Sequence, residues 1–203
     1  MSDDAPLVRP SSLRKRAAVL SAGRDLFLGE GYERTSVDAV AARAGISKRT
    51  VYDYFGDKDG LYDAVITEVA AEIVDTMRSA VDEELTTGRE LRAALLALVR
   101  RVVATTFGSP DHVRLRQLAP TDRRARRNFA QFANQPEDLL AARFDQFVDE
   151  GELHTTNTGR AAQHFFALTF SLAANAISNA EGQHPDIDAL LVDGVDAFLR
   201  AYR

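Results

Sequence analysis

The chain has 203 residues, enough for one large domain or for a small domain joined to a larger one. Apolar residues make up 45% and charged residues 27%, which is typical of a folded globular protein. The absence of cysteine excludes disulfides, thiolate nucleophiles and cysteine-bound zinc or iron–sulfur clusters. No apolar run reaches the roughly 18 residues of a membrane span, and residues 1–10 contain acids and prolines where a signal peptide would be basic and apolar. We therefore expect a cytoplasmic protein with no membrane partner.

The formal net charge of −5 is unevenly distributed along the chain. Residues 1–60 carry 10 Lys and Arg against 9 Asp and Glu, whereas residues 61–203 carry 15 against 21. Residues 9–24 contain basic residues and no acid, which predicts a local positive arm. An acidic chain is a poor general coat for nucleic acid, so any contact with nucleic acid must be local.

Apolar residues recur every three or four positions from end to end, which predicts an all-α fold. Residues 1–10 are expected to be a disordered tail. The first helix is expected from Ser11 to Leu28, with Gly29 ending it. Its apolar stripe would comprise Leu13, Ala17, Leu20 and Phe27.

The next segment has the start and stop signals of two short helices. Thr35 and Asp38 are spaced as a capping box at the start of a second helix. Gly45 can end that helix in the left-handed conformation, and Ser47 can cap a third helix, Lys48–Phe55. Two short helices joined by so tight a turn are the helix-turn-helix arrangement, in which the second helix enters the major groove of DNA.

A helical wheel places Val51 and Phe55 on the buried side of the third helix, with Arg49 and Asp53 opposite them. Hydroxyl and amino side chains nearby are of the types that contact phosphate. They are Ser36, Ser47, Lys48, Tyr54 and Lys58. The alternative is a tight corner in an ordinary helical bundle, because the turn sequence Ala-Gly-Ile-Ser is common on its own.

A long fourth helix, from about Lys58 to Glu84, is expected to join two domains that we place at residues 1–57 and 58–203. Glycines and prolines divide the remainder of the chain into shorter helices. Helices are expected at 89–107, 137–150, 158–180 and 186–202, with a short helix and an uncertain stretch between 110 and 136.

From Thr35 to Leu61 the chain reads T-S-V-x-x-V-A-x-x-A-G-I-S-K-x-T-V-Y-x-Y-F-x-x-K-x-x-L. This pattern resembles the DNA-binding region of the TetR family of bacterial transcriptional repressors. The resemblance implies an N-terminal three-helix helix-turn-helix domain and a C-terminal helical bundle for ligand binding and dimerisation. The contacts that it implies are Thr35 and Ser36 at phosphate, Lys48, Arg49, Thr50 and Tyr52 in the groove, and Tyr54 and Lys58 at the DNA backbone.

Two positions depart from the family pattern. Gly60 stands where the family often has an acid, and Asp53 places a negative charge on the groove face. Asp53 has two interpretations. It forms an intrahelical ion pair with Arg49, or it accepts a hydrogen bond from a cytosine while Arg49 contacts a neighbouring guanine.

The segment from Phe165 to Ile177 is apolar nearly all round, so it must be covered on both sides. A second copy of the chain would provide that cover in a two-fold four-helix interface. The alternative is the central helix of a monomer. The interface residues expected are Phe165, Leu172, Ala176, Leu191, Val195, Phe198 and Leu199.

A mostly apolar effector pocket is expected in the C-terminal domain, although each of its residues could equally belong to the core. Its candidate residues are Phe107, Leu115, Phe129, Phe132, Phe144, His164 and Phe166. Six arginines between Arg114 and Arg127 form either a solvated surface or an attractor for an anionic effector.

The sequence contains no G-x-S-x-G, phosphate-binding glycine loop, H-E-x-x-H or paired carboxylate motif, and its four histidines lack metal-ligand spacing. We expect no enzyme activity, metal or cofactor. The predicted function is a ligand-responsive repressor that binds a palindromic operator as a homodimer and is released by a small, mostly apolar effector. The alternatives are a helical enzyme or carrier, which would not bind duplex DNA, and a scaffold protein, which would bind neither DNA nor ligand.

Overall fold

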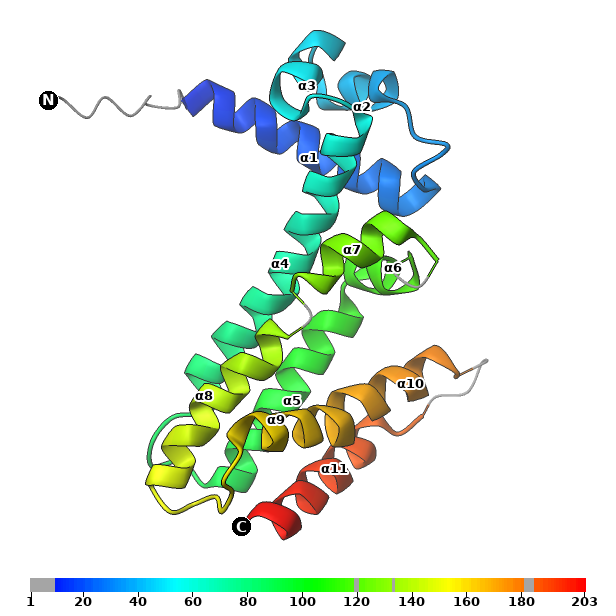
Figure 1. Ribbon diagram of the computed structural model, residues 1–203. Coiled ribbons are helices and arrows are strands. Elements are labelled where there is room, and N and C mark those ends of the chain that lie inside the picture. Colours follow the sequence, from blue (N-terminus) through cyan, green and yellow to red (C-terminus); the bar gives the residue numbers. More distant parts are fainter. Residues whose placement is uncertain (1–9, 119–120, 133, 181–184) are drawn as a thin grey trace, which may run out of the picture. The chain divides into compact units, whose positions relative to one another are not determined.

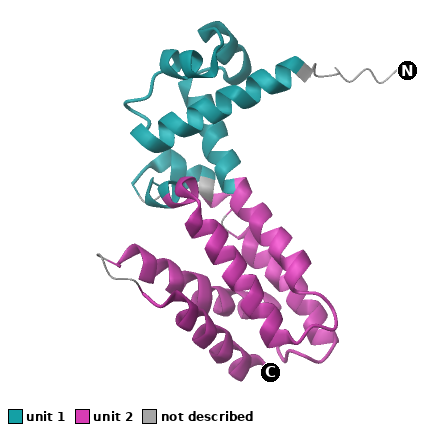
Figure 2. Ribbon diagram, turned by 180° about the vertical axis from the view of Figure 1, so that it is seen from behind, with its two compact units in different colours: residues 1–70, 114–129 teal, residues 71–113, 130–203 magenta. Residues whose placement is uncertain are grey.

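A computed structural model of the chain describes residues 10–118, 121–132, 134–180 and 185–203, and within these ranges every regular element is a helix (Figure 1). The all-α prediction is confirmed. None of these helices combines the length and the apolar character needed to cross a lipid bilayer. The helices form two compact units (Figure 2). Unit 1 consists of residues up to Ala70 together with Arg114–Phe129, and unit 2 of Ala71–Val113 together with Ala130–Arg203.

Helix bounds agree with the expected ones to within a few residues. The first four helices are α1 (Pro10–Glu30), α2 (Val37–Ala44), α3 (Lys48–Phe55) and α4 (Lys58–Glu84). They are followed by α5 (Leu91–Gly108), α6 (Pro110–Leu118), α7 (Arg123–Ala130) and α8 (Gln135–Asp149). The C-terminal part contains α9 (Thr158–Phe166), the π-helical turn η1 (Ala167–Ser171), α10 (Leu172–Ser178) and α11 (Ile187–Tyr202).

Of the stripe predicted for helix α1, Leu20 and Phe27 are buried, whereas Leu13 and Ala17 are not. Leu13 is 55% exposed and Ala17 is also exposed. The helix continues past Gly29 to Glu30, and Gly31 directly after it has a φ of 89°, in the left-handed region that glycine tolerates. Its buried residues are Val19, Leu20, Ala22, Phe27 and Leu28.

The first turns of α4 belong to unit 1, so the compact units divide inside α4 and not at residue 57. Leu61 and Val65 are buried beside Gly23 of α1, and the rings of Phe27 and Tyr62 meet edge to face with centroids 5.1 Å apart. These contacts cross between α1 and α4, and the composition of α4 alone does not reveal them. Residues 1–9 of the predicted disordered tail lie outside the described residues, and Pro10 begins α1.

Unit 2 is organised around three phenylalanines. Phe165 of α9 meets Phe144 of α8 and Phe198 of α11 edge to face, at centroid distances of 5.8 and 5.0 Å. Phe198 also stacks on Phe144 at 5.4 Å. Offset and edge-to-face pairs of this kind add to the stabilisation that comes from burying the rings.

Most of the residues predicted for a dimer interface are core residues of a single chain, which corrects that prediction. Helices α8 and α11 of the same chain pack against α9 and so provide the cover that the dimer prediction assigns to a second copy. Of the predicted residues only Leu172, 45% exposed, and the half-buried Ala176 remain accessible. The buried ones are Phe165, Leu191, Val195, Phe198 and Leu199.

Helix α11 approaches the π-helical turn closely at Gly194. A Cβ atom on Gly194 would lie 2.2 Å from the carbonyl oxygen of Leu168 and 3.1 Å from Cγ2 of Thr169. Backbone cannot move as easily as the end of a side chain, so any larger residue at this position forces the two helices apart.

We expect Gly194→Ala to lower the free energy of unfolding by about 1–3 kcal/mol, the usual cost of overpacking a core. Chemical denaturation at a fixed protein concentration measures it. Gly159→Ala is the control, because its Cβ would meet only Asn157 Oδ1, at 3.5 Å. Equal stability of the two variants would contradict the close approach of α11.

Candidate nucleic-acid interface

The turn between α2 and α3 is held by local hydrogen bonds. Ser36 accepts at Oγ from the amide of Ala39 (3.1 Å), and Ser47 accepts at Oγ from the amide of Thr50 (3.2 Å), so a serine caps the start of each helix. Between them Gly45 adopts the left-handed conformation with φ of 68°. The turn therefore has the predicted helix-turn-helix form.

Helix α3 packs against the rest of unit 1 mainly through its inner side. Val51 is fully buried, and Phe55 is half-buried beneath the guanidinium of Arg16 of α1, 5.3 Å from the ring centroid. Tyr54 also contacts α1, through a 3.1 Å hydrogen bond between its hydroxyl and that of Ser12. The buried position of Val51 agrees with the helical wheel.

The outer side of α3 is brought together as predicted. Lys48, Arg49 and Asp53 are exposed, Tyr52 is 41% exposed, and Thr50 is half-buried. The face therefore offers ammonium, guanidinium, hydroxyl and carboxylate groups to a partner. These are the groups that contact base edges and phosphates.

Lys48 is not free in the structure. Its Nζ lies 2.8 Å from Oδ2 of Asp38 in α2, and this hydrogen bond raises the pKa of Lys48 above its ordinary value. Asp38 therefore pairs with Lys48 and does not close the predicted capping box. Both side chains are largely solvent-exposed, so the ion pair is weak and exchangeable for a phosphate.

Thr35 corrects another prediction. It is only 2% exposed and donates from Oγ1 to the carbonyl oxygen of Gly31 at 2.9 Å, so its side chain is not available to phosphate. Ser36, one residue later, is exposed and is the cap of α2. A single-residue shift in the position of the cap accounts for the difference.

The structure accounts for the two departures from the family pattern differently. Asp53 and Arg49 form no ion pair among the described residues, so the intrahelical interpretation of Asp53 is not realised. At Gly60 a Cβ would lie 2.2 Å from the carbonyl oxygen of Phe55. The close passage of α4 past the end of α3 therefore requires glycine there.

Within unit 1, Tyr32 is the centre of a polar cluster that the sequence analysis does not predict. Its hydroxyl donates to Asp59, and its ring lies beneath the ammonium of Lys58 at 4.2 Å and the guanidinium of Arg124 at 5.2 Å. Arg124 also forms an ion pair with Asp59. The hydrogen bond to Asp59 and, to a smaller extent, burial raise the pKa of Tyr32 to about 12. Lys58, predicted to contact DNA, is thus engaged with Tyr32.

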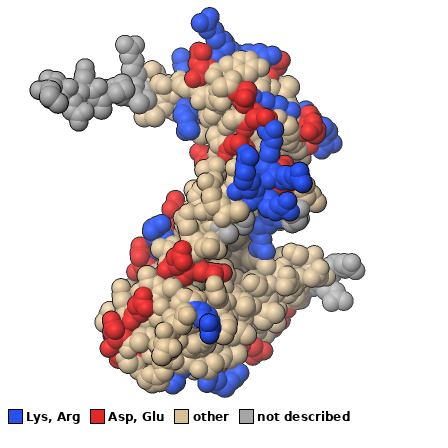
Figure 3. Space-filling model, viewed as in Figure 1, with Lys and Arg blue, Asp and Glu red and all other residues tan. Residues whose placement is uncertain are grey.

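A second set of contacts holds α7 to α4 within unit 1. The Tyr62 hydroxyl donates to Oδ2 of Asp122 at 2.6 Å, and the Asn128 side-chain amide donates to Oδ1 of Asp63 at 2.7 Å. Burial raises the pKa of Asp122, but hydrogen bonds from Tyr62 and from backbone amides outweigh it, so the net pKa is below its ordinary value. The arginines of α7 form a dense basic patch on the surface (Figure 3). Arg124 and Arg127 within it pair with Asp59 and Asp63 of α4, so the patch is partly structural.

The residues predicted for an effector pocket are divided between the two compact units. Leu115 is buried in unit 1, whereas Phe144 is in the aromatic core of unit 2. His164 is exposed and 2.6 Å from the Tyr202 hydroxyl through Nδ1. Phe107, Phe132 and Phe166 are half-buried, and the side chain of Phe129 lies outside the described residues.

Comparison with known families decides the affiliation. Residues 19–65 match the family described as bacterial regulatory proteins, tetR family, and residues 91–203 match the AefR-like transcriptional repressor C-terminal domain. The chain belongs to the TetR family. The curated relatives that it matches are named as transcriptional regulators.

Curated relatives of this TetR-family chain match its N-terminal part. The transcriptional activator FasR of Mycolicibacterium smegmatis is 34% identical over 83 residues, covering 41% of this chain and 38% of FasR. The regulator AlkX of Mycobacterium tuberculosis is 34% identical over 77 residues, covering 38% and 36%. The chain thus spans little more than a third of these relatives.

Solved structures match nearly the whole fold. A TetR-family regulator of Mesorhizobium loti has a TM-score of 0.83 at 23% identity, covering 96% of this chain and 99% of that one. The flavonoid-responsive regulator FrrA has a TM-score of 0.73 at 25% identity, covering 94% and 97%. FadR of Bacillus subtilis, solved in complex with stearoyl-CoA, has a TM-score of 0.67 at 17% identity, covering 90% and 97%.

We expect Asp53→Ala to raise the affinity for random duplex DNA about threefold to tenfold at low salt, because it removes a charge that repels phosphate. Fluorescence anisotropy with a labelled random duplex measures it. Asp149→Ala, which removes an exposed carboxylate of α8, is the control. Unchanged affinity of the Asp53 variant would count against a DNA-facing α3.

We expect Asp122→Asn to flatten the pH dependence of thermal stability. A carboxylate whose folded pKa is lowered stabilises the fold above its unfolded pKa of about 4, and the stabilisation is lost as pH falls through the folded value. Tyr62→Phe removes one of the hydrogen bonds and should give an intermediate profile. Melting temperatures between about pH 7 and pH 2.5 test this. Parallel profiles for wild type and Asp122→Asn would refute it.

Proposed function

We propose that this protein is a ligand-responsive repressor that binds a palindromic operator as a homodimer and releases it when a small, mostly apolar effector binds. The observation that carries the proposal is the outer face of α3. It is an exposed, hydrogen-bonding face held by caps and by one buried valine, and the fold itself makes little use of Arg49, Tyr52 and Asp53. Such a helix fits the major groove, with Ser36 and Ser47 near phosphate.

Dimerisation is a requirement of the proposal. Two recognition helices must reach half-sites about 34–36 Å apart on a palindrome, which one copy cannot do. Among the described residues of unit 2, Leu172 on α10 is the largest exposed apolar side chain, and the half-buried Ala176 follows it one helical turn later. We place the centre of the dimer interface at these two residues.

The class of effector is inferred from two proteins of similar fold. FrrA is flavonoid-responsive and FadR was solved with stearoyl-CoA, and these relatives support an effector with a large apolar portion. Helix α4 contributes residues to both units, so it is the element through which effector binding would alter the spacing of the recognition helices. The effector must favour the DNA-incompetent spacing by its difference in affinity for the two states.

The test is selection of bound duplexes from genomic fragments, followed by size measurement of the complex with the selected duplex. We expect two protomers on each duplex, an affinity that falls steeply with salt, and release by candidate apolar compounds. A protein that leaves every duplex unprotected at low salt would refute the proposal. Ligand binding without DNA binding would indicate a carrier, and neither would indicate a scaffold.

On the selected operator we expect Arg49→Ala to weaken binding about tenfold or more, because a bidentate arginine contributes about 1–3 kcal/mol of discrimination at one base pair. Arg160→Ala in α9 is the control, since it removes an exposed arginine of unit 2. Electrophoretic mobility shift with the operator and with a scrambled duplex separates specific from non-specific effects. Equal losses for both variants would contradict a role for α3 in reading sequence.

A further inference from the structure

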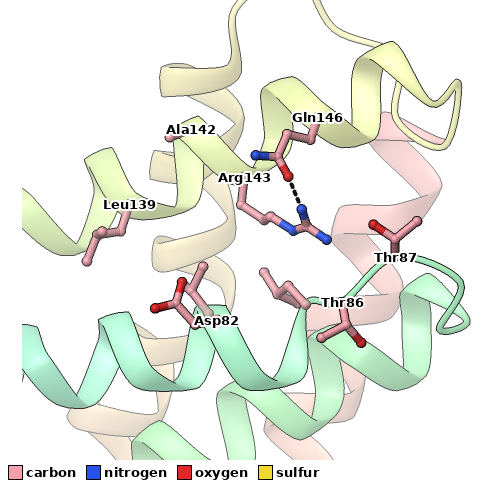
Figure 4. A pocket seen from close by; sticks show the side chains of 9 residues that line it. Asp82, Thr86, Thr87, Leu139, Ala142, Arg143 and Gln146 are labelled. Carbon is pink, nitrogen blue, oxygen red and sulfur yellow. Dashed lines mark hydrogen bonds between the residues drawn. The ribbon is translucent and has the colours of Figure 1, made fainter.

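A groove of about 430 Å³ lies within unit 2, between the end of α4 and α8 (Figure 4). Its volume is within the range of small-molecule sites. The turn after α4 closes one end of it. Its principal lining residues are Val81, Asp82, Leu85, Thr86, Leu139 and Arg143.

Arg143 is the cation of this groove. Its guanidinium is held in place by Phe147, whose ring centroid is 4.9 Å away, and by a hydrogen bond from Nη1 to Oε1 of Gln146. Nε is buried and has no hydrogen-bond partner. Leaving a buried donor of a charged group unpaired is costly, so the position calls for a partner. Figure 4 shows the guanidinium pointing into the groove, toward Thr86 and Thr87.

Two arginines of α5 show how this chain uses the same edge of the guanidinium. Arg92 donates from Nε and Nη2 to both oxygens of Asp196, at 2.6 and 3.0 Å. Arg100 binds Asp188 in the same way, at 2.6 and 2.8 Å. In Arg143 that edge has no carboxylate partner among the described residues. The planar fork of arginine matches a carboxylate, so a carboxylate is the group that would complete it.

The other residues that line the groove indicate what the remainder of the ligand would be. Val81 and Leu85 are buried and Leu139 is half-buried, so together they provide an apolar wall. Asp82 is a lining carboxylate, and in Figure 4 it is turned toward Leu139 and away from the guanidinium. One cation with one acid nearby suits a single negative charge better than a dianion such as phosphate.

We propose that the groove between α4 and α8 binds a small monoanionic amphiphile, with its carboxylate on Arg143 and its alkyl or aryl body along Val81, Leu85 and Leu139. We further assign it as the effector site, which rests on the proposed function. The site adjoins the last turns of α4, the helix that both units share. Its position differs from that of the pocket residues predicted from the sequence.

The experiment is isothermal titration calorimetry of the full chain with octanoate, octan-1-ol and octylamine, which share one chain length. We expect octanoate to bind about tenfold or more tightly than the other two, because only it can pair with the guanidinium. Arg143→Gln should remove that preference, and Arg143→Lys should weaken it by retaining the charge without the fork. Asp82→Asn should tighten octanoate binding. Arg160→Gln is the matched control and should leave binding unchanged.

Retention of the preference for octanoate in Arg143→Gln, or equal binding of octan-1-ol, would overturn the site. So would the absence of binding at millimolar octanoate to a wild-type protein that circular dichroism shows to be folded. A second titration adds the selected operator duplex. Octanoate should release the duplex from wild type and not from Arg143→Gln. A duplex that binds but never responds refutes the effector assignment alone, whereas a failure to bind any duplex refutes the proposed function.

Discussion

The orientation of one eight-residue helix is the constraint on which the DNA-binding unit depends. Helix α3 buries a single side chain fully, Val51, so packing alone fixes its rotation weakly. The left-handed Gly45 and the cap at Ser47 fix where the helix begins. Because the first residue of the helix and its buried residue, Val51, are both fixed, the outer side chains of α3 face away from the core. A helix this short would be marginal in isolation, so these few contacts are what make its outer face a defined surface.

Polar contacts inside unit 1 extend this order to a distant part of the sequence. Asp59 contacts both Tyr32 of the α1–α2 loop and Arg124 of α7. Asp122 accepts a hydrogen bond from the hydroxyl of Tyr62. Each is a hydrogen bond to a charged group and therefore stronger than a neutral one. Bonds of this strength between segments far apart in the sequence help unit 1 to keep its shape.

Sequence patterns over a few residues predicted those features that depend on neighbouring residues in the chain. Spacing and capping residues indicated the helices and the turn, because caps and left-handed glycines act over three or four residues. The outer face of α3 followed from a helical wheel. The polar cluster at Tyr32 was not predictable, because its partners are separated by more than 25 residues and surface charges resemble one another in a sequence. The same holds for the apolar α9–α10 segment, in which burial by α8 and α11 could not be distinguished from burial by a second copy.

The chain passes between its two compact units three times, after Ala70, after Val113 and after Phe129. A cut at any one place therefore does not release an intact DNA-binding unit. A hybrid regulator made by joining the first 70 residues to a foreign C-terminal part would lack Arg114–Phe129, and Asp59, Tyr62 and Asp63 would lose their partners in that stretch. Engineering a biosensor from this protein requires transplanting both stretches together.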